Sequence, residues 1–258
     1  MINTRIMIIT AFAALLTSFG ASANHIPSNS GGWFGFEGRS TLLLDLGRFD
    51  PLVELEGRLE DAGLELGYRS LTAGTYLRLH KNLKAGLFYR VQQGARHDDD
   101  WIEPALDEWE WVDSGGRTEQ VLILDVTPRF LLEALPGGNW ILAIKNRYQY
   151  NTFNGHHSLM VRPGITYFLM RSREPLLNVS LNYGLYIPLN FGETLLYEHE
   201  PYVSVLYHLN RSVKLELTGA YKTVVWSSSE DSLANGDTYA VRNRSLVVGF
   251  ALLFPVSF

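Results

Sequence analysis

Residues 177–191 read LNVSLNYGLYIPLNF and alternate between two kinds of side chain. Every odd position from Leu177 to Phe191 is apolar or aromatic, whereas the even positions include Asn178, Ser180 and Asn182. Successive side chains of a β-strand point to opposite faces, so one face of this segment is apolar and the other is mostly polar. Strands of soluble sandwiches usually run about five or six residues, whereas a tilted strand that crosses a bilayer needs about 9–11. The stretch therefore predicts a membrane-crossing strand.

The same alternation recurs along the chain, and charged residues appear repeatedly on one face and almost never on the other. It predicts ten strands, near 51–60, 64–80, 83–93, 119–132, 139–150, 158–170, 176–188, 197–208, 212–227 and 238–257. Residues 33–46 are expected to add one or two more. A change of parity between Tyr68 and Leu71 predicts a β-bulge in the second of the ten strands.

Lipid offers no partner to backbone polar groups, so a sheet in a membrane must close on itself with its apolar face outward. We therefore expect an all-β fold, a closed antiparallel transmembrane β-barrel of 10–12 strands. With both chain ends on the periplasmic rim, the strand total should be even, 10 or 12. A soluble β-sandwich is the competing interpretation, because the period of the pattern alone does not exclude it.

The chain begins with Arg5 before an apolar run that finishes at Ala21-Ser22-Ala23, a pattern typical of a cleaved secretory signal. We expect a signal peptide at residues 1–23 and a single barrel domain at residues 24–258; a retained membrane anchor is the alternative. No later apolar run approaches the roughly 20 residues of a membrane helix. Secretion leaves the periplasm, the exterior or the outer membrane as destinations, and the strand pattern favours the outer membrane.

Composition excludes several classes of function. The chain of 258 residues has no cysteine, so it has no disulfide and no cysteine-ligated metal. Its formal net charge of −5 and its lack of dense basic stretches argue against a nucleic-acid partner.

The last strand ends in SLVVGFALLFPVSF, residues 245–258, which places Phe250, Phe254 and Phe258 on one face. This ending resembles the carboxyl-terminal signal by which bacterial outer-membrane proteins are recognised for assembly. The hairpin TYLRLHKNLKAGLFYRV (75–91) and the segment VRPGITYFLM (161–170) are similar to a small bacterial outer-membrane β-barrel protein of an uncharacterised family. The resemblance implies two partners: the barrel-assembly machinery, through the last strand, and outer-membrane lipid with lipopolysaccharide.

The polar face should line the barrel interior. The candidate lining residues are Arg58, Arg78, Arg90, Asp125, Arg129, Lys145, Arg147, Arg162, Glu198, Glu200, Lys214, Glu216 and Lys222. Isolated charges are costly in so narrow a space, so they should pair or line a constricted pore. The preferred hypothesis is a narrow channel or transporter for small polar or ionic solutes, with a slight excess of bases favouring anions. A closed structural barrel is the second hypothesis.

A membrane enzyme acting on lipid or lipopolysaccharide is the third hypothesis. Its candidate is Asn154-Gly155-His156-His157-Ser158, where a histidine could activate a serine. Adjacent residues of one strand point to opposite faces, so His157 and Ser158 cannot pair directly and a polar loop is the better interpretation. We predict no catalytic residues and no cofactor.

The most acidic segment lies at residues 97–113 and could hold Ca²⁺ or Mg²⁺. It lacks the ligand spacing of a calcium loop, and acidic runs are usually solvated, so we predict no metal site. Its tryptophans Trp101, Trp109 and Trp111 could instead fold over the mouth or sit among lipid headgroups.

Overall fold

The computed structural model describes residues 30–60, 65–94, 118–153, 155–190, 196, 198–227 and 240–257. These residues form eleven strands. They are β1 (Ser30–Asp45), β2 (Phe49–Glu60), β3 (Glu65–His80), β4 (Leu83–Gln93), β5 (Thr118–Leu131), β6 (Trp140–Asn151), β7 (His157–Arg171), β8 (Glu174–Pro188), β9 (Glu198–Asn210), β10 (Val213–Ser227) and β11 (Ala240–Ser257). Among the residues described, none belongs to a helix long and apolar enough to cross a membrane.

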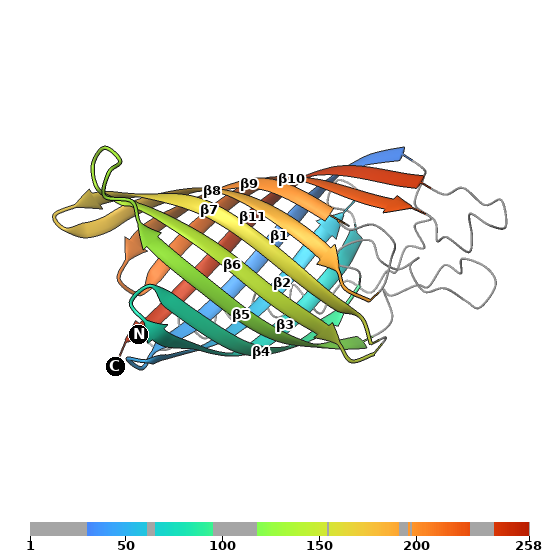
Figure 1. The fold of residues 1–258 in the computed structure, drawn as a ribbon, viewed down its shortest axis with the longest axis horizontal. Helices are drawn as coiled ribbons and strands as arrows, with labels where there is room; N and C mark the ends of the chain where they lie inside the picture. The colour runs from blue at the N-terminus through green and yellow to red at the C-terminus, as the bar shows by residue number, and fades with distance from the viewer. Residues whose placement is uncertain are drawn as a thin grey trace.

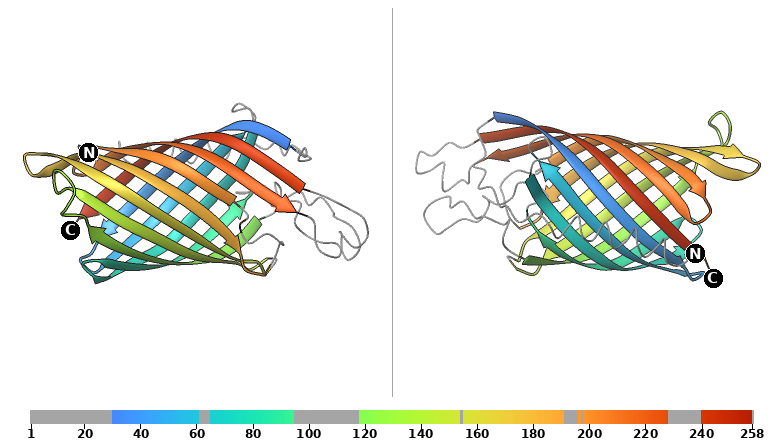
Figure 2. Two further views of the ribbon diagram at one scale, coloured as in Figure 1. Left: turned by 45° about the horizontal axis from the view of Figure 1, so that its top comes forward. Right: turned by 180° about the vertical axis from the view of Figure 1, so that it is seen from behind.

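The strands form one closed barrel in which chain neighbours are also spatial neighbours (Figure 1). Each consecutive pair from β1–β2 to β10–β11 is antiparallel. The barrel closes where β1 and β11 run side by side and parallel, with Ser30 opposite Arg242 and Asp45 opposite Ser257 (Figure 2). This closure leaves no sheet edge, so the backbone groups of the first and last strands pair with each other.

The parallel closure corrects the expectation of an even strand number and of an antiparallel sheet throughout. Of the segment 33–46, residues 33–45 belong to one strand, β1, which makes the described total eleven. An odd number of sequentially paired strands necessarily brings the first and last strands together in the same direction. Closure requires only that both edges be hydrogen-bonded, and a parallel ladder meets that requirement.

The ten strands predicted from alternation are confirmed, with bounds within two residues of those observed. The predicted β-bulge in β3 is present, but its predicted position between Tyr68 and Leu71 is wrong. The register between β2 and β3 shifts where Arg58 faces Tyr68 and Leu59 faces Leu66, so the extra residue is Gly67. The Tyr68 side chain is fully buried together with those of Ser70 and Thr72. Tyr68 is an aromatic residue on the otherwise polar inner face, so the sequence pattern looked like a change of parity after it.

The two faces of the sheet differ sharply in polarity. On β5, residues 118–126 alternate strictly between exposed and buried. Leu122, Leu124 and Val126 are exposed, whereas Asp125 and Ile123 are buried. The other strands repeat the pattern, with exposed side chains that include Leu71, Leu87, Leu181, Leu217, Leu246 and Phe250. The outer surface of the barrel is thus mainly apolar, and most of the charge lies within.

Aromatic residues occupy both ends of the outer face. At the start of β6, Trp140 packs on Tyr167 with ring centroids 4.7 Å apart, and its indole donates to the Pro136 carbonyl. At the other end of β6, Tyr150 stacks on His157, whose ring also bonds the Tyr148 hydroxyl. Aromatic side chains therefore mark both ends of β6 on the outer face.

The connections are of two kinds. At one end, which we call the turn-side mouth, lie the tight links from β1 to β2, β3 to β4, β7 to β8 and β9 to β10, together with the end of β11. At the other end, which we call the loop-side mouth, lie the ends of β4, β6 and β10 and the starts of β1, β5, β7 and β11. The predicted acidic segment 97–113, the signal peptide and Phe258 lie outside the described residues.

Candidate functional site

Several polar pairs in the interior join strands that are not neighbours, and three of those in the described residues pass over a small residue of the strand between. Arg39 on β1 reaches Glu216 on β10 at 2.7 Å, and the β11 residue opposite both is Ala251. A larger side chain at Ala251 would stand in the path of this pair. The small inner face of the last strand therefore has a structural role.

The other two pairs follow the same design over glycines. Arg162 on β7 lies 3.6 Å from Glu200 on β9, and a Cβ added at Gly184 of β8 would be 3.5 Å from each of them. The Tyr76 hydroxyl on β3 donates to Asp125 on β5 at 3.0 Å, with Gly86 of β4 opposite both.

Asp125 is a buried carboxylate of the interior with several bonding partners. Its side chain is 0% exposed, and Arg147 donates to both of its oxygens, from Nε at 2.8 Å and from Nη2 at 2.9 Å. The Lys145 ammonium lies 3.4 Å away, and the Tyr76 hydroxyl completes the set. Two cations on β6 thus share one buried anion. The two hydrogen bonds from the Arg147 guanidinium fix the orientation of the Asp125 carboxylate.

Beside Asp125 the interior contains an apolar cluster that the sequence reading missed. Phe88, Val121 and Ile123 are buried, and Leu52 and Tyr76 pack against them. The Phe88 and Tyr76 rings meet edge to face at 4.7 Å. These side chains come from β2, β3, β4 and β5, so this cluster fills the part of the lumen next to those strands.

The rest of the barrel wall carries charges that water can reach. The side chains of Arg39, Lys145, Arg162, Glu54, Glu200 and Glu216 are between 16% and 29% exposed, although every one of them is paired. They project from β1, β2, β6, β7, β9 and β10. The middle of the lumen is therefore apolar on one side and charged and partly exposed on the other.

Towards the loop-side mouth the lining is more tightly buried. Lys222 and Glu198 pair at 3.3 Å with side-chain exposures of 2% and 0%. Arg90 donates to Thr72 and to Gln149, both at 3.3 Å, and Gln149 donates to the Tyr186 hydroxyl. This buried polar layer is the most closed level of the described interior.

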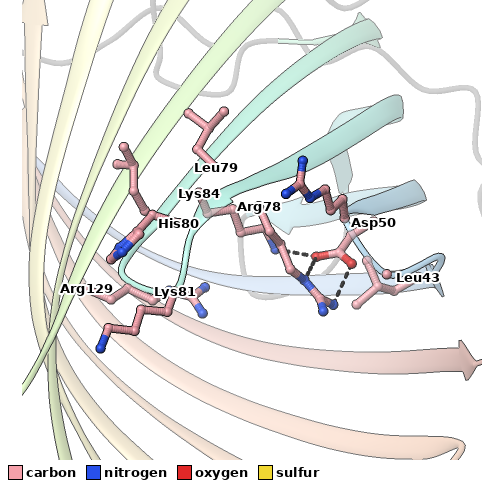
Figure 3. Close-up of a pocket in the computed structure, with 11 residues that line it drawn as sticks. Leu43, Asp50, Arg78, Leu79, His80, Lys81, Lys84 and Arg129 are labelled. Carbon is pink, nitrogen blue, oxygen red and sulfur yellow. Dashed lines mark hydrogen bonds and ion pairs between the residues drawn. The ribbon is translucent and has the colours of Figure 1, made fainter.

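The turn-side mouth holds a cavity of about 560 Å³. Asp50, nearly buried, accepts two bonds from Arg78, at 2.6 and 3.1 Å, and lies 3.4 Å from Lys84 (Figure 3). Lys84 also sits 3.7 Å above the Tyr76 ring, which links this cavity to the apolar cluster. Arg129 lines the same cavity.

The thirteen predicted lining residues thus fall into three levels. Arg58, Arg90, Glu198 and Lys222 are buried towards the loop-side mouth, and Asp125, Lys145, Arg147, Arg162, Glu200 and Glu216 form the paired middle level. Arg78 and Arg129 lie at the turn-side cavity, and Lys214 is half-buried near the same end of β10. Predicted assembly residues Phe250 and Phe254 lie on β11, with Phe250 exposed on the outer face.

Several interior charges were not among the predicted residues, although their parity could have found them. Arg39 shares the face of Thr41 on β1, Asp50 shares the face of Glu54 on β2, and Lys84 shares the face of Arg90 on β4. Each lies at the edge of an expected strand or in the segment 33–46, where the number of strands was still open.

His157 and Ser158, the first two residues of β7, do not form a catalytic pair. His157 lies on the outer face with Tyr148 and Tyr150, and its backbone N–H donates to Asn190 at 2.6 Å. Ser158 is the next residue along β7 and faces the opposite side. Within the described part of the chain, no three histidine, cysteine or acidic side chains are grouped to hold a metal ion.

No known family model matches the chain, and a search of curated proteins returned no match. The fold and the interior described above therefore carry the functional argument.

Proposed function

We propose that the protein is an integral outer-membrane barrel that acts as a narrow channel or transporter for small polar or ionic solutes. The observation that carries the proposal is the partly hydrated arc of opposite-sign pairs, Arg39–Glu216 and Arg162–Glu200 among them, inside a barrel whose outer face is apolar. Charges that are both paired and reachable by water are suited to exchange their partners with a passing ion. Passage of a solute along these pairs does not require a catalytic group.

The proposal also covers the orientation of the barrel in the membrane and its recognition by the assembly machinery. Short turns face the periplasm in outer-membrane barrels, so the turn-side mouth is the periplasmic one. Strand β11 exposes Phe250 on its outer face and is the element that the assembly machinery would read. Lipid and lipopolysaccharide contact the apolar belt.

Conductance tests the channel. The purified whole protein, reconstituted into planar bilayers, should give discrete current steps in potassium chloride. Arg39→Gln leaves Glu54 and Glu216 without their shared cation, so the reversal potential in a salt gradient should move towards cation selectivity. Arg211→Gln removes an exposed cation that is paired with Glu174 near the barrel rim, and it should leave the selectivity unchanged.

A closed structural barrel is the second candidate, and the apolar cluster favours it. Phe88→Ala removes the largest buried ring of that cluster. If the wild-type protein gives no steps and Phe88→Ala does, the lumen is closed in the native protein and the channel proposal fails. If neither conducts, the proposal fails as well.

A further inference from the structure

The cavity of the turn-side mouth has a marked excess of positive charge. Five cationic side chains line it, Arg48, Arg78, Lys81, Lys84 and Arg129, and the only acidic residue among the described lining is Asp50. Asp45 adds a second carboxylate, 3.2 Å from Arg78. Two carboxylates against five cations leave a surplus that the described residues do not neutralise.

Two of the cations, Arg78 and Lys84, are paired with Asp50, and the other three are exposed. Asp50 is only 4% exposed and bonds Arg78 while it also attracts Lys84, so these two are oriented by a fixed buried anion (Figure 3). Arg48, Lys81 and Arg129 are exposed, and no carboxylate pairs with them among the residues that the structure describes. Cations oriented by Asp50 and the three exposed cations that line the same cavity can together surround an anion.

The size and the donor chemistry indicate the ligand class. A space of about 560 Å³ falls within the range of small-molecule sites and is large enough for an anion bigger than a halide. Guanidinium groups match the oxygens of phosphate by forked hydrogen bonds, and lysine serves as a point charge for the same group. A ligand with two or three negative charges would balance the surplus.

We propose that the turn-side mouth binds a small soluble anion that bears phosphate groups, coordinated by Arg129 and Arg48 together with Arg78 and Lys84. This binding does not depend on whether the lumen conducts. In a conducting barrel, the same site would concentrate such anions at the entrance.

Titration of the purified whole protein in neutral detergent with inorganic pyrophosphate tests the proposal. Calorimetry should show saturable binding that weakens as salt is added, since exposed charges are screened. Arg129→Gln and Arg48→Gln should each weaken binding by about fivefold, the effect of one partly exposed charge contact. Both residues are exposed, so neither substitution should unfold the barrel.

The matched control is Arg211→Gln, which removes one exposed cation near the barrel rim outside the cavity. It should bind pyrophosphate as the wild type does. Equal weakening by Arg211→Gln would show a general charge effect and overturn the proposal, as would the absence of saturable binding. Anionic-lipid nanodiscs give a further arm: if binding is seen only to lipid headgroups and never to pyrophosphate, the proposed soluble ligand is wrong.

Discussion

Asp125 is the residue on which the charge balance of the middle lumen depends most. Three side chains, Arg147, Lys145 and Tyr76, converge on this one buried carboxylate. If Asp125 loses its charge, Lys145 and Arg147 are left without the anion between them. Removing one partner of a buried pair is usually far costlier than the net value of the pair.

Asp125→Asn should therefore destabilise the folded barrel by about 2–3 kcal/mol, less than for a fully buried pair because Lys145 and Arg147 are in part hydrated. Urea unfolding of the protein refolded in micelles, followed by tryptophan fluorescence, measures the loss. Glu174→Gln, which breaks the exposed pair with Arg211, is the control and should cost less than about 1 kcal/mol. Equal losses in the two variants would mean that the interior pairs are no more important than surface pairs.

The sequence shows which residues carry charge on the inner face, but it does not show their partners. Arg39 and Glu216 are far apart in the chain and meet only because β1 follows β11 around the barrel and Ala251 leaves room between them. Such pairing depends on barrel closure and on small residues of a third strand, and neither can be read from the alternation of one strand.

At the scale of the strand, β4 shows how a glycine makes room for the interior. A Cβ added at Gly86 would lie 2.5 Å from the Phe88 ring and 2.7 Å from the Tyr76 ring. The two rings would have to move, and with them the hydroxyl that bonds Asp125.

We expect Gly86→Ala to destabilise the barrel by about 1–3 kcal/mol, the usual cost of overpacking. Gly219→Ala on β10 is the matched control, because a Cβ there meets nothing within 4 Å. It should be neutral or slightly stabilising, since alanine restricts the unfolded chain more than glycine does. The same urea titration compares the two, and a Gly86→Ala protein as stable as the control would contradict the packing described here.

Alternation predicted the strands well because each strand has one face in contact with polar groups and the other exposed and apolar. It failed for the apolar cluster, since Val121 and Ile123 share the face of Asp125 and break the rule that inner residues are polar. The face on which Tyr68 lies was mispredicted for the same reason, because this aromatic side chain is buried on the inner face. A narrow lumen next to β2–β5 is filled by packing, and there an apolar side chain fits as well as a paired charge.

For the whole molecule, the least expected feature is the parallel seam between β1 and β11. Its register places Phe36 opposite Val248. Because the chain has no cysteine, the pair Phe36→Cys and Val248→Cys can be tested alone. Mild oxidation should join the two strands and change the mobility of the denatured chain, whereas Phe36→Cys with Phe250→Cys, two residues out of register, should crosslink much less. Preferential crosslinking of the shifted pair would refute this closure.

The central proposal is that hydrocarbon covers the outer face of the barrel. Single spin-labelled cysteines at positions 122 to 126 of β5, in protein reconstituted into lipid bilayers, test it most directly. The account predicts that labels at Leu122, Leu124 and Val126 are relaxed strongly by dissolved oxygen and weakly by a water-soluble nickel complex, and that the label at Asp125 does not share this lipid signature. Strong relaxation of the three outer labels by the nickel complex would show that water, not lipid, covers that face, and would contradict the account.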